Sequence, residues 1–156
     1  MPFRGATVSV YAHATEDENK VLKALRAVLP EDIEIRRSNL KGHHGNPITS
    51  LNAVIDRKPA LREFWKRILA NLRRGDLDKL RERMLAEVDD SCRTYLRFDK
   101  QHAYGGELVL TTEGDSIHVK LKILAFPAKR EIALALIQQF IEEGRHNEVE
   151  KKVYRV

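Results

Sequence analysis

The sequence contains a single cysteine, Cys92, which excludes an internal disulfide framework and a four-cysteine zinc site. No apolar run approaches the length of about 18 residues that a membrane-spanning helix needs. The first residues, "MPFRGATVSV", lack the apolar core of a signal peptide. Internal repeats, low-complexity tracts and linkers are also missing. We therefore expect a soluble, cytoplasmic protein with no membrane partner, folded as one domain within its 156 residues.

Three common catalytic signatures are missing as well. The sequence lacks the phosphate-binding pattern G-x-x-x-x-G-K-[ST], the dinucleotide pattern G-x-G-x-x-G and the hydrolase pattern G-x-S-x-G. Nucleotide hydrolysis, dinucleotide binding and hydrolase chemistry of the nucleophile-elbow type therefore have no support. We expect a protein without a cofactor or a resident metal.

Positive charge is what the sequence has in excess, and it is confined to one stretch. The net charge is +5, and residues 57–83 hold ten basic against four acidic side chains, while the two flanking parts are close to neutral. A localised basic zone favours an anionic partner such as RNA, DNA or an acidic protein, and a solvated helix face is the alternative. The residues expected to attract phosphates are Arg57, Lys58, Arg62, Lys66, Arg67, Arg73 and Arg74.

Strands are indicated by alternation of apolar and polar residues. The clearest case is "DSIHVKLKIL", in which every second residue from Ile117 to Ile123 is apolar and the residues between are basic. A glycine pair in "AYGGELVL" is expected to turn or bulge the chain into the following strand. Strands are predicted at residues 6–14, 32–40, 48–56, 94–100 and 115–124.

The first two helices are indicated by apolar stripes and by signals at their ends. Thr15 and Glu18 have the spacing of a capping box, which opens a helix that ends at Pro30. Pro59 suits the first turn of a longer helix, and Leu69 falls on the core stripe of that helix. Both helices are thus expected to cover a sheet with one apolar side.

Two further helices follow. The shorter one begins at Asp76, after Gly75 breaks the preceding helix, and the last begins after Pro127. Gly144 is expected to stop the last helix, leaving a charged tail at residues 145–156 whose end could add a short strand.

Strands that come in pairs between helices predict an α+β fold, with a mostly antiparallel sheet covered on one face by helices. The single domain would span residues 1–144. The uncovered face would present aromatic rings among positive groups, a combination that stacks on bases and meets phosphates in nucleic-acid-binding sheets. An ordinary wet sheet face is the alternative. The residues expected on this face are Tyr11, His13, Tyr95, Arg97, His118, Lys120 and Lys122.

The segment "LKGHHGNPI", residues 40–48, allows three interpretations. His43 and His44 are adjacent, so on an extended chain they point to opposite sides and chelate one metal poorly. A metal site would need further ligands, such as His13, Asp99 or His102. Gly42 and Gly45 instead permit an anion-binding nest of backbone N–H groups, and Asn46-Pro47 is a common turn opener. The basic residues expected to help this loop bind a phosphate of RNA are Arg36, Arg37 and Lys41.

The segment "YLRFDKQHAYGG" carries polar groups at a strand end. Asp99 is expected to pair with Arg97 and orient it, with a role as a catalytic acid or base as the alternative. The amide of Gln101 suits the reading of base edges, with an ordinary exposed side chain as the alternative. Cys92 and Trp65 are expected in the core.

Three segments together, "HATED" at 13–17, "GHHGNPI" at 42–48 and "LRFDKQHAY" at 96–104, resemble an archaeal family of small proteins. That family is described as RNA-binding and as predicted exosome subunits, with a ribosomal protein L5-like fold. The resemblance spans nearly the whole domain and implies an α+β fold with an RNA-linked role, but it carries no catalytic residues. On the matching positions we expect contacts to RNA at His43, His44, Asn46, Arg97, Lys100, Gln101 and Tyr104.

These observations lead to the hypothesis of a non-catalytic RNA-binding protein, accessory to archaeal RNA processing of the exosome type or to ribosome-related machinery. One rival is a metal-assisted nuclease or phosphoesterase that uses His43, His44, Asp99 and His102. A second rival is a protein-binding adaptor that docks an acidic partner on the basic helix. A homodimer through an exposed sheet face or edge is left open.

Overall fold

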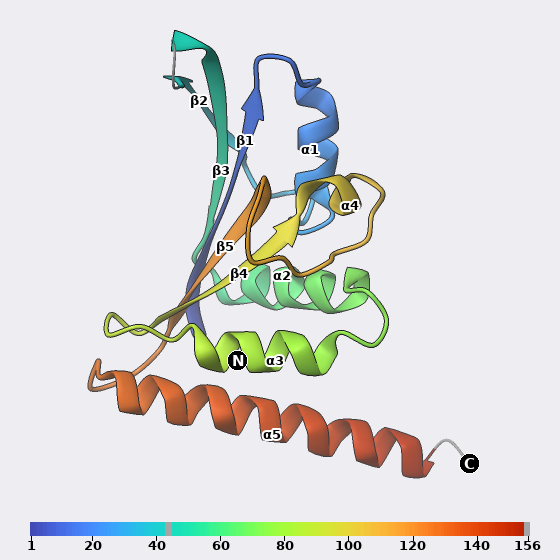
Figure 1. The fold of residues 1–156 in the computed structure, drawn as a ribbon. Coiled ribbons are helices and arrows are strands. Elements are labelled where there is room, and N and C mark those ends of the chain that lie inside the picture. Colours follow the sequence, from blue (N-terminus) through green and yellow to red (C-terminus); the bar gives the residue numbers. More distant parts are fainter. Residues whose placement is uncertain (43–44, 155–156) are drawn as a thin grey trace.

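The computed structural model describes residues 1–42 and 45–154, with side chains in that part up to Val149. Within it the chain forms five strands and five helices (Figure 1). In order, these are β1 (Phe3–His13), α1 (Glu18–Arg26), β2 (Arg36–Lys41), β3 (Pro47–Ile55), α2 (Lys58–Asn71), α3 (Leu77–Ala86), β4 (Arg93–Asp99), α4 (Lys100–Tyr104), β5 (Ser116–Ile123) and α5 (Arg130–Tyr154).

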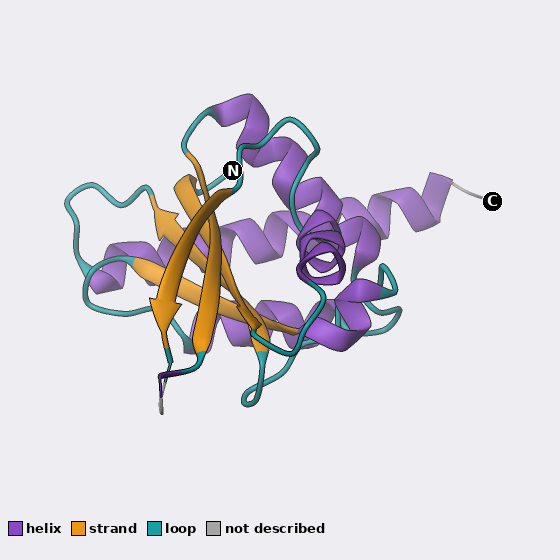
Figure 2. Cartoon of the chain, turned by 90° about the horizontal axis from the view of Figure 1, so that it is seen from above, coloured by secondary structure: helices purple, strands orange, loops and turns teal. Residues whose placement is uncertain are grey.

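The strands form one sheet in the order β2-β3-β1-β5-β4, and every neighbouring pair is antiparallel. Helices α1 to α4 lie on one side of this sheet, and α5 runs along α3 (Figures 1 and 2). The predicted fold class, α+β with an antiparallel sheet covered on one face by helices, is confirmed. No helix in the described part of the chain combines the length and the apolar character of a membrane-spanning segment.

The core lies between the apolar face of the sheet and the helices, as the alternation predicts. Every second residue of β5 from Ile117 to Ile123 is buried. Trp65 of α2 contacts Phe3 of β1 and Phe140 of α5, with ring centroids 5.5 and 5.8 Å apart. This cluster joins the two helices to the central strand, and the prediction of a core role for Trp65 is confirmed.

The start of the first helix differs from the prediction. Asp17 is the N-cap of α1, and its side chain accepts a hydrogen bond from the backbone N–H of Asn19. Thr15 therefore does not cap the helix. Glu18 does not reach back either, because both of its carboxylate oxygens accept hydrogen bonds from Arg37 on β2. The predicted capping box is wrong for two reasons: Asp17 caps the helix in place of Thr15, and Glu18 is held by an ion pair with Arg37.

The last helix does not stop at Gly144 but continues to Tyr154. A Cβ at position 144 would lie 3.0 Å from Nη2 of Arg81 on α3. Arg81 passes this point and donates a hydrogen bond of 2.8 Å to Glu148, one turn further along α5. The glycine thus makes room for a neighbouring side chain and does not break the helix, so the predicted helix end and the short strand beyond it are wrong.

Two smaller differences concern the start of β2 and the segment that follows β4. The strand predicted at residues 32–40 begins only at Arg36. After β4 the chain enters the short helix α4, and the glycine pair ends that helix, with Gly106 at φ 90°. Residues 107–110 then form only isolated bridges, with Leu108 pairing to Leu72 and Leu110 to Phe98. The glycines therefore terminate a helix that sequence patterns did not indicate.

Candidate nucleic-acid interface

The uncovered face of the sheet carries a continuous row of polar and basic side chains. The strand registers align Arg97 with His118, His118 with Ser9, Ser9 with Asn52, and Asn52 with Arg36. This row crosses all five strands, and four strand spacings make it about 19 Å wide. Arg97 and Arg36, which were predicted as contacts on separate grounds, therefore share one row and lie at opposite ends of it.

A second row lies beside the first, nearer the β5–α5 connection. In it, Tyr95 aligns with Lys120, and Lys120 with Thr7. Further along the sheet in the other direction, the side chain of Tyr11 is 44% exposed. The sequence placed Tyr11, Tyr95 and Lys120 on one face, and the strand registers confirm that arrangement.

The two rows enclose a shallow hollow of about 380 Å³ on this face. Arg97 borders it and is held in place, because its Nε donates to the Ser116 hydroxyl at 3.2 Å and its Nη1 donates to the Thr112 carbonyl at 3.3 Å. Its guanidinium nevertheless forms no ion pair with a described carboxylate, so its charge is available to an anion. The side chains around the hollow are Thr7, Ser9, Tyr95, Leu96, Arg97, His118, Val119 and Lys120.

Two titratable groups at this hollow are shifted by their surroundings. Burial lowers the pKa of His118, and the positive charge of Arg97 lowers it further, so the ring is neutral at pH 7 and can both donate and accept a hydrogen bond. The hydrogen bond that the Tyr95 hydroxyl donates to Asp89, at 2.7 Å, raises the pKa of Tyr95. Tyr95 thus offers the hollow its half-buried ring, while its hydroxyl is already engaged.

Arg93 and Lys122 are neighbours across β4 and β5 at the end of this face. Lys122 was predicted as a contact, whereas Arg93 was missed because it precedes the predicted strand at 94–100. The Nε of Arg93 is buried and has no hydrogen-bond partner among the described residues. Extending the alternation of β4 back by one residue would have placed Arg93 on the same face as Tyr95.

Several predicted contacts lie away from the open face. Arg37 aligns with the buried Leu51 on the helix-covered side, where it binds Glu18. Tyr104 is half-buried beside α1, with the Nζ of Lys23 4.8 Å from its ring centroid. Gln101 and Lys41 are exposed, but Gln101 belongs to α4 and Lys41 to the Arg37 side of β2. The structure does not bring these residues together with Arg97.

Lys100 is the clearest departure from the predicted contacts. It is only 3% exposed, and its ammonium donates to the Tyr11 carbonyl at 3.0 Å and to Glu16 at 2.8 Å. It also pairs with Asp115. Burial acts to raise the pKa of Glu16, but the hydrogen bonds from Lys100 and from the His13 backbone outweigh it and lower that pKa. Lys100 is therefore an internal tie between β1 and two loops, and its charge is neutralised within the protein.

The groups proposed for metal or acid–base chemistry are not assembled into a site in the described residues. Asp99 caps α4 by accepting from the His102 backbone N–H at 2.9 Å, and it also contacts the His102 ring at 2.6 Å. These bonds outweigh the effect of burial and lower the pKa of Asp99. The predicted Arg97–Asp99 pair is thus replaced by a local Asp99–His102 pair. His13 lies near Glu16 and Asp115, but the Lys100 ammonium contacts both of these carboxylates.

The glycine loop between β2 and β3 is a tight turn in its described part. The Gly42 N–H donates to the Asn46 carbonyl at 2.7 Å, and the Gly45 N–H donates to the Gly42 carbonyl at 3.0 Å. These two donors are therefore used inside the loop and do not form an anion-binding nest. Asn46 is exposed. His43 and His44 lie outside the described residues.

The basic zone of residues 57–83 does not adjoin the open face. Helix α2 lies on the helix-covered side of the sheet (Figure 1). Its apolar side chains are buried in the core, so its exposed basic side chains lie on the far side of the helix from the sheet. Arg67 is half-buried and donates through Nε to the Arg26 carbonyl at 2.6 Å. The remaining predicted phosphate-attracting residues are exposed: Arg57, Lys58, Arg62, Lys66, Arg73 and Arg74. The molecule therefore has two separate basic surfaces.

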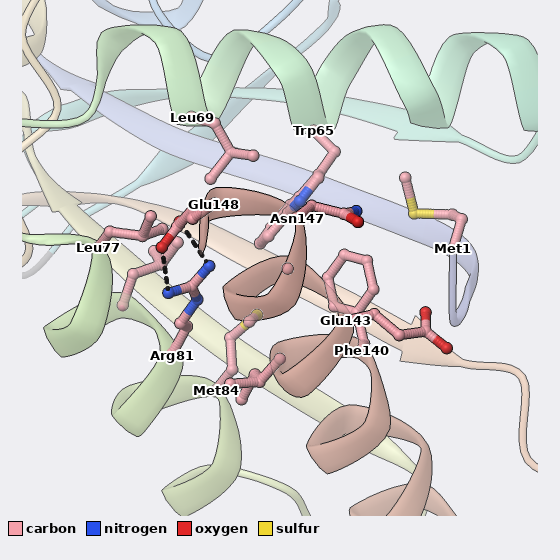
Figure 3. Close-up of a pocket in the computed structure, with 13 residues that line it drawn as sticks. Met1, Trp65, Leu69, Leu77, Arg81, Met84, Phe140, Glu143, Asn147 and Glu148 are labelled. Carbon is pink, nitrogen blue, oxygen red and sulfur yellow. Dashed lines mark hydrogen bonds and ion pairs between the residues drawn. The ribbon is translucent and has the colours of Figure 1, made fainter. Parts of the chain in front are cut away.

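A cavity of about 360 Å³ lies among α2, α3 and α5 (Figure 3). Leu69, which was predicted in the core, is instead 40% exposed and lines this cavity together with Trp65 and Phe140. Among the described residues that line the cavity, Arg81 is the one with a guanidinium, and Glu148 engages it. The cavity lies apart from the open face.

An α+β domain with a broad, basic and uncovered sheet face is the class of protein that the structure defines. A family model described as RNA binding matches residues 6–123. The chain therefore belongs to this RNA-binding family.

Relatives in archaea support this assignment. RNA-binding protein PAB1135 of Pyrococcus abyssi is 36% identical over 140 residues, which cover 86% of this chain and 91% of that protein. The solved structure of Mth689 from Methanothermobacter thermautotrophicus is 38% identical with a TM-score of 0.73, covering 88% of this chain and 96% of that one. AF2318 from Archaeglobus fulgidus is 34% identical with a TM-score of 0.78, covering 88% and 98%. The resemblance to an archaeal RNA-binding family is confirmed.

Proposed function

We propose that this chain is a non-catalytic protein that binds RNA on the open face of its sheet. The observation that carries the proposal is the five-strand row from Arg97 to Arg36, which stands uncovered beside Lys120 and the exposed ring of Tyr11. Cations at both ends of the row suit phosphates, and rings and neutral hydrogen-bonding groups between them suit bases. Membership in an RNA-binding family supports the choice of RNA over other anions.

The setting of this activity is part of the same proposal. The protein would act in the cytoplasm, within RNA-processing machinery of the exosome type or next to the ribosome, in line with the resemblance to predicted exosome subunits and to the ribosomal protein L5-like fold. Strand β2, an edge strand whose six residues are all exposed, offers a place where two copies could pair.

The test compares charge removal on the two basic surfaces. Affinity for a labelled single-stranded RNA, a hairpin RNA and a duplex DNA is measured across a salt series. Lys120→Ala and Arg36→Ala alter the open face, and Lys66→Ala and Arg62→Ala are matched controls on the exposed side of α2. Each open-face change should weaken RNA binding and reduce the slope of log affinity against log salt by about 0.7 for each phosphate that the replaced side chain neutralised.

The controls decide which surface holds the RNA. If the α2 variants lose affinity while the open-face variants bind as wild type, the site lies on the basic helix and the proposal is wrong. If the wild-type protein binds no RNA form above duplex DNA, the sheet face is only a charged surface.

A further inference from the structure

The loop between β5 and α5 holds an aromatic ring almost entirely in water. Phe126 is 95% exposed, and Leu124 two residues earlier is 56% exposed. A phenylalanine in this position forgoes the free energy of burial that its ring would gain in the core. The chain around it is otherwise well packed, since Ile123 is buried immediately before the loop. The ring is therefore accessible to a ligand.

The loop that presents this ring is fixed by backbone hydrogen bonds. The Leu124 N–H donates to the Pro2 carbonyl at 2.7 Å, and the Ala125 N–H donates to the Ile123 carbonyl at 2.9 Å. On the other side of the ring, the Lys129 N–H donates to the Pro127 carbonyl at 2.8 Å, and α5 begins at the next residue. An ordered loop loses little conformational freedom when its tip meets a ligand, so the ring is prepared for binding.

The segment of the chain that carries the ring is positively charged. Between Asp115 and Glu131 the sequence contains no acidic residue but has Lys120, Lys122, Lys129 and Arg130. The loop leaves β5 directly after the end of the open face where Lys122 and Arg93 are neighbours (Figure 1). The loop before β4 adjoins this end of the sheet as well, since the Ile123 N–H donates to the Cys92 carbonyl at 2.8 Å.

Two of these cations, Lys122 and Lys129, form no ion pair with a carboxylate in the described part of the chain. Arg93 differs, because its charge lies close enough to Asp89 to lower the pKa of that carboxyl. An apolar pocket on a partner protein would suit the ring but would leave the cations without partners. A nucleobase attached to a phosphodiester satisfies both, since the base has a flat face for the ring and the phosphates have the opposite charge.

We propose that Phe126 stacks on an unpaired RNA base while Lys122 and Lys129 bind the flanking phosphates. This inference rests on the proposed function and narrows its substrate to RNA with a single-stranded segment at this end of the sheet. Bases inside a duplex are stacked on each other and present no free face to the ring. The ring therefore distinguishes single strands and loops from paired RNA, whereas the basic rows alone attract both.

The first experiment removes the ring without changing charge. Affinities of wild type, Phe126→Ala, Phe126→Trp and the control Leu124→Ala are measured for a single-stranded RNA of about 12 nucleotides and for a blunt RNA duplex. Phe126→Ala should bind the single strand about 5- to 150-fold more weakly, the range that loss of one base–aromatic stack gives. The salt slope should not change, because the ring neutralises no phosphate. Phe126→Trp should bind as wild type, and duplex affinity should stay the same in all four proteins.

A second readout reports stacking directly. The sole tryptophan, Trp65, is buried. In a Trp65→Phe background, the indole introduced by Phe126→Trp is the sole tryptophan fluorophore. Its emission should be quenched when the single-stranded RNA is added, and it should remain unchanged with the duplex.

Failure of this inference can be told apart from failure of the proposed function. If Phe126→Ala binds the single strand as tightly as wild type while Lys120→Ala binds it more weakly, the stacking role is wrong and RNA binding by the sheet stands. If wild type binds no RNA, both proposals fail. If Phe126→Ala instead converts a dimer to a monomer and leaves RNA affinity unchanged, the ring belongs to a contact between copies of the chain, and the stacking role is again wrong.

Discussion

Replacing Lys100 should destabilise the protein without removing its affinity for RNA. Lys100→Met keeps most of the aliphatic stem but removes an ammonium that holds Glu16, Asp115 and the Tyr11 carbonyl. The oxygens of Glu16 and Asp115 lie within 4.8 Å of each other, so the two carboxylates would repel once the cation is gone.

The size of the expected loss of stability follows from the burial of these groups. Breaking a buried ion pair costs about 3–5 kcal/mol when the remaining charge stays buried. The side chains of Glu16 and Asp115 are 24% and 42% exposed, so water can solvate them in part. We therefore expect a loss of about 2–3 kcal/mol in the free energy of unfolding, below the fully buried range.

Urea unfolding monitored by circular dichroism measures this loss, with Gln101→Ala as the matched control. Gln101 is exposed and adjacent, so its replacement should change stability by less than about 0.5 kcal/mol. A loss below about 1 kcal/mol for Lys100→Met would refute the view of Lys100 as a structural tie. A drop in RNA affinity with stability intact would refute it in a second way, since it would make the ammonium a group that binds the ligand.

The ion pair between Lys100 and Glu16 also predicts that the free energy of unfolding depends on pH. The folded-state pKa of Glu16 is lowered from its ordinary value of 4.5, so its ionised form is favoured by folding. Its contribution is therefore fully present above about pH 4.5 and is lost as the pH falls through the folded-state pKa. Unfolding curves of Lys100→Met should lose less stability than wild type over that acid range, because the donor that lowers the pKa has been removed.

Three further changes test other parts of the structure by the same unfolding measurement. Asp99→Ala removes the side chain that caps α4 and should cost about 0.5–2 kcal/mol; no loss would mean that the cap bond to His102 is dispensable. Phe98→Ala empties a fully buried site and should cost about 3–5 kcal/mol, and a loss under 2 kcal/mol would indicate that the core collapses around it. Arg81→Met should change stability by less than about 1 kcal/mol, because the Glu148 side chain is 45% exposed and returns to water; a loss above 3 kcal/mol would show that the pair is a structural anchor.

Local sequence patterns predicted most of the strands, because the alternation that marks a strand is visible in neighbouring residues. The alternation in β5 has a period of two, so it specified both the strand and the face of each side chain. The grouping of Tyr11, Tyr95 and Lys120 on one face followed from the same rule, even before the order of the strands was known.

Features that depend on residues far apart in the sequence could not be predicted from local patterns. Lys100 looks like an exposed strand-end cation in the sequence, and its burial depends on Glu16 and Asp115, which come from two other segments. Gly144 carries a helix-stop signal, and only the passage of Arg81 beside it explains why the helix continues. The separation of the basic helix from the open face likewise follows from packing, because charge along a sequence does not say which side of a sheet a helix covers.

The central place of β1 in the sheet has a consequence for synthesis of the protein. Val8 pairs with Ala53 on one side and with Val119 on the other, so the two flanks of β1 are completed at very different stages of translation. When the ribosome has released β3, the opposite edge of β1 is still without a partner, and it stays so until β5 emerges. Pairing across such long stretches of chain is slow and leaves strand edges exposed in the meantime. The nascent chain therefore carries that edge unpaired until most of its length has left the ribosome, and the open face assembles only as β5 and β4 join.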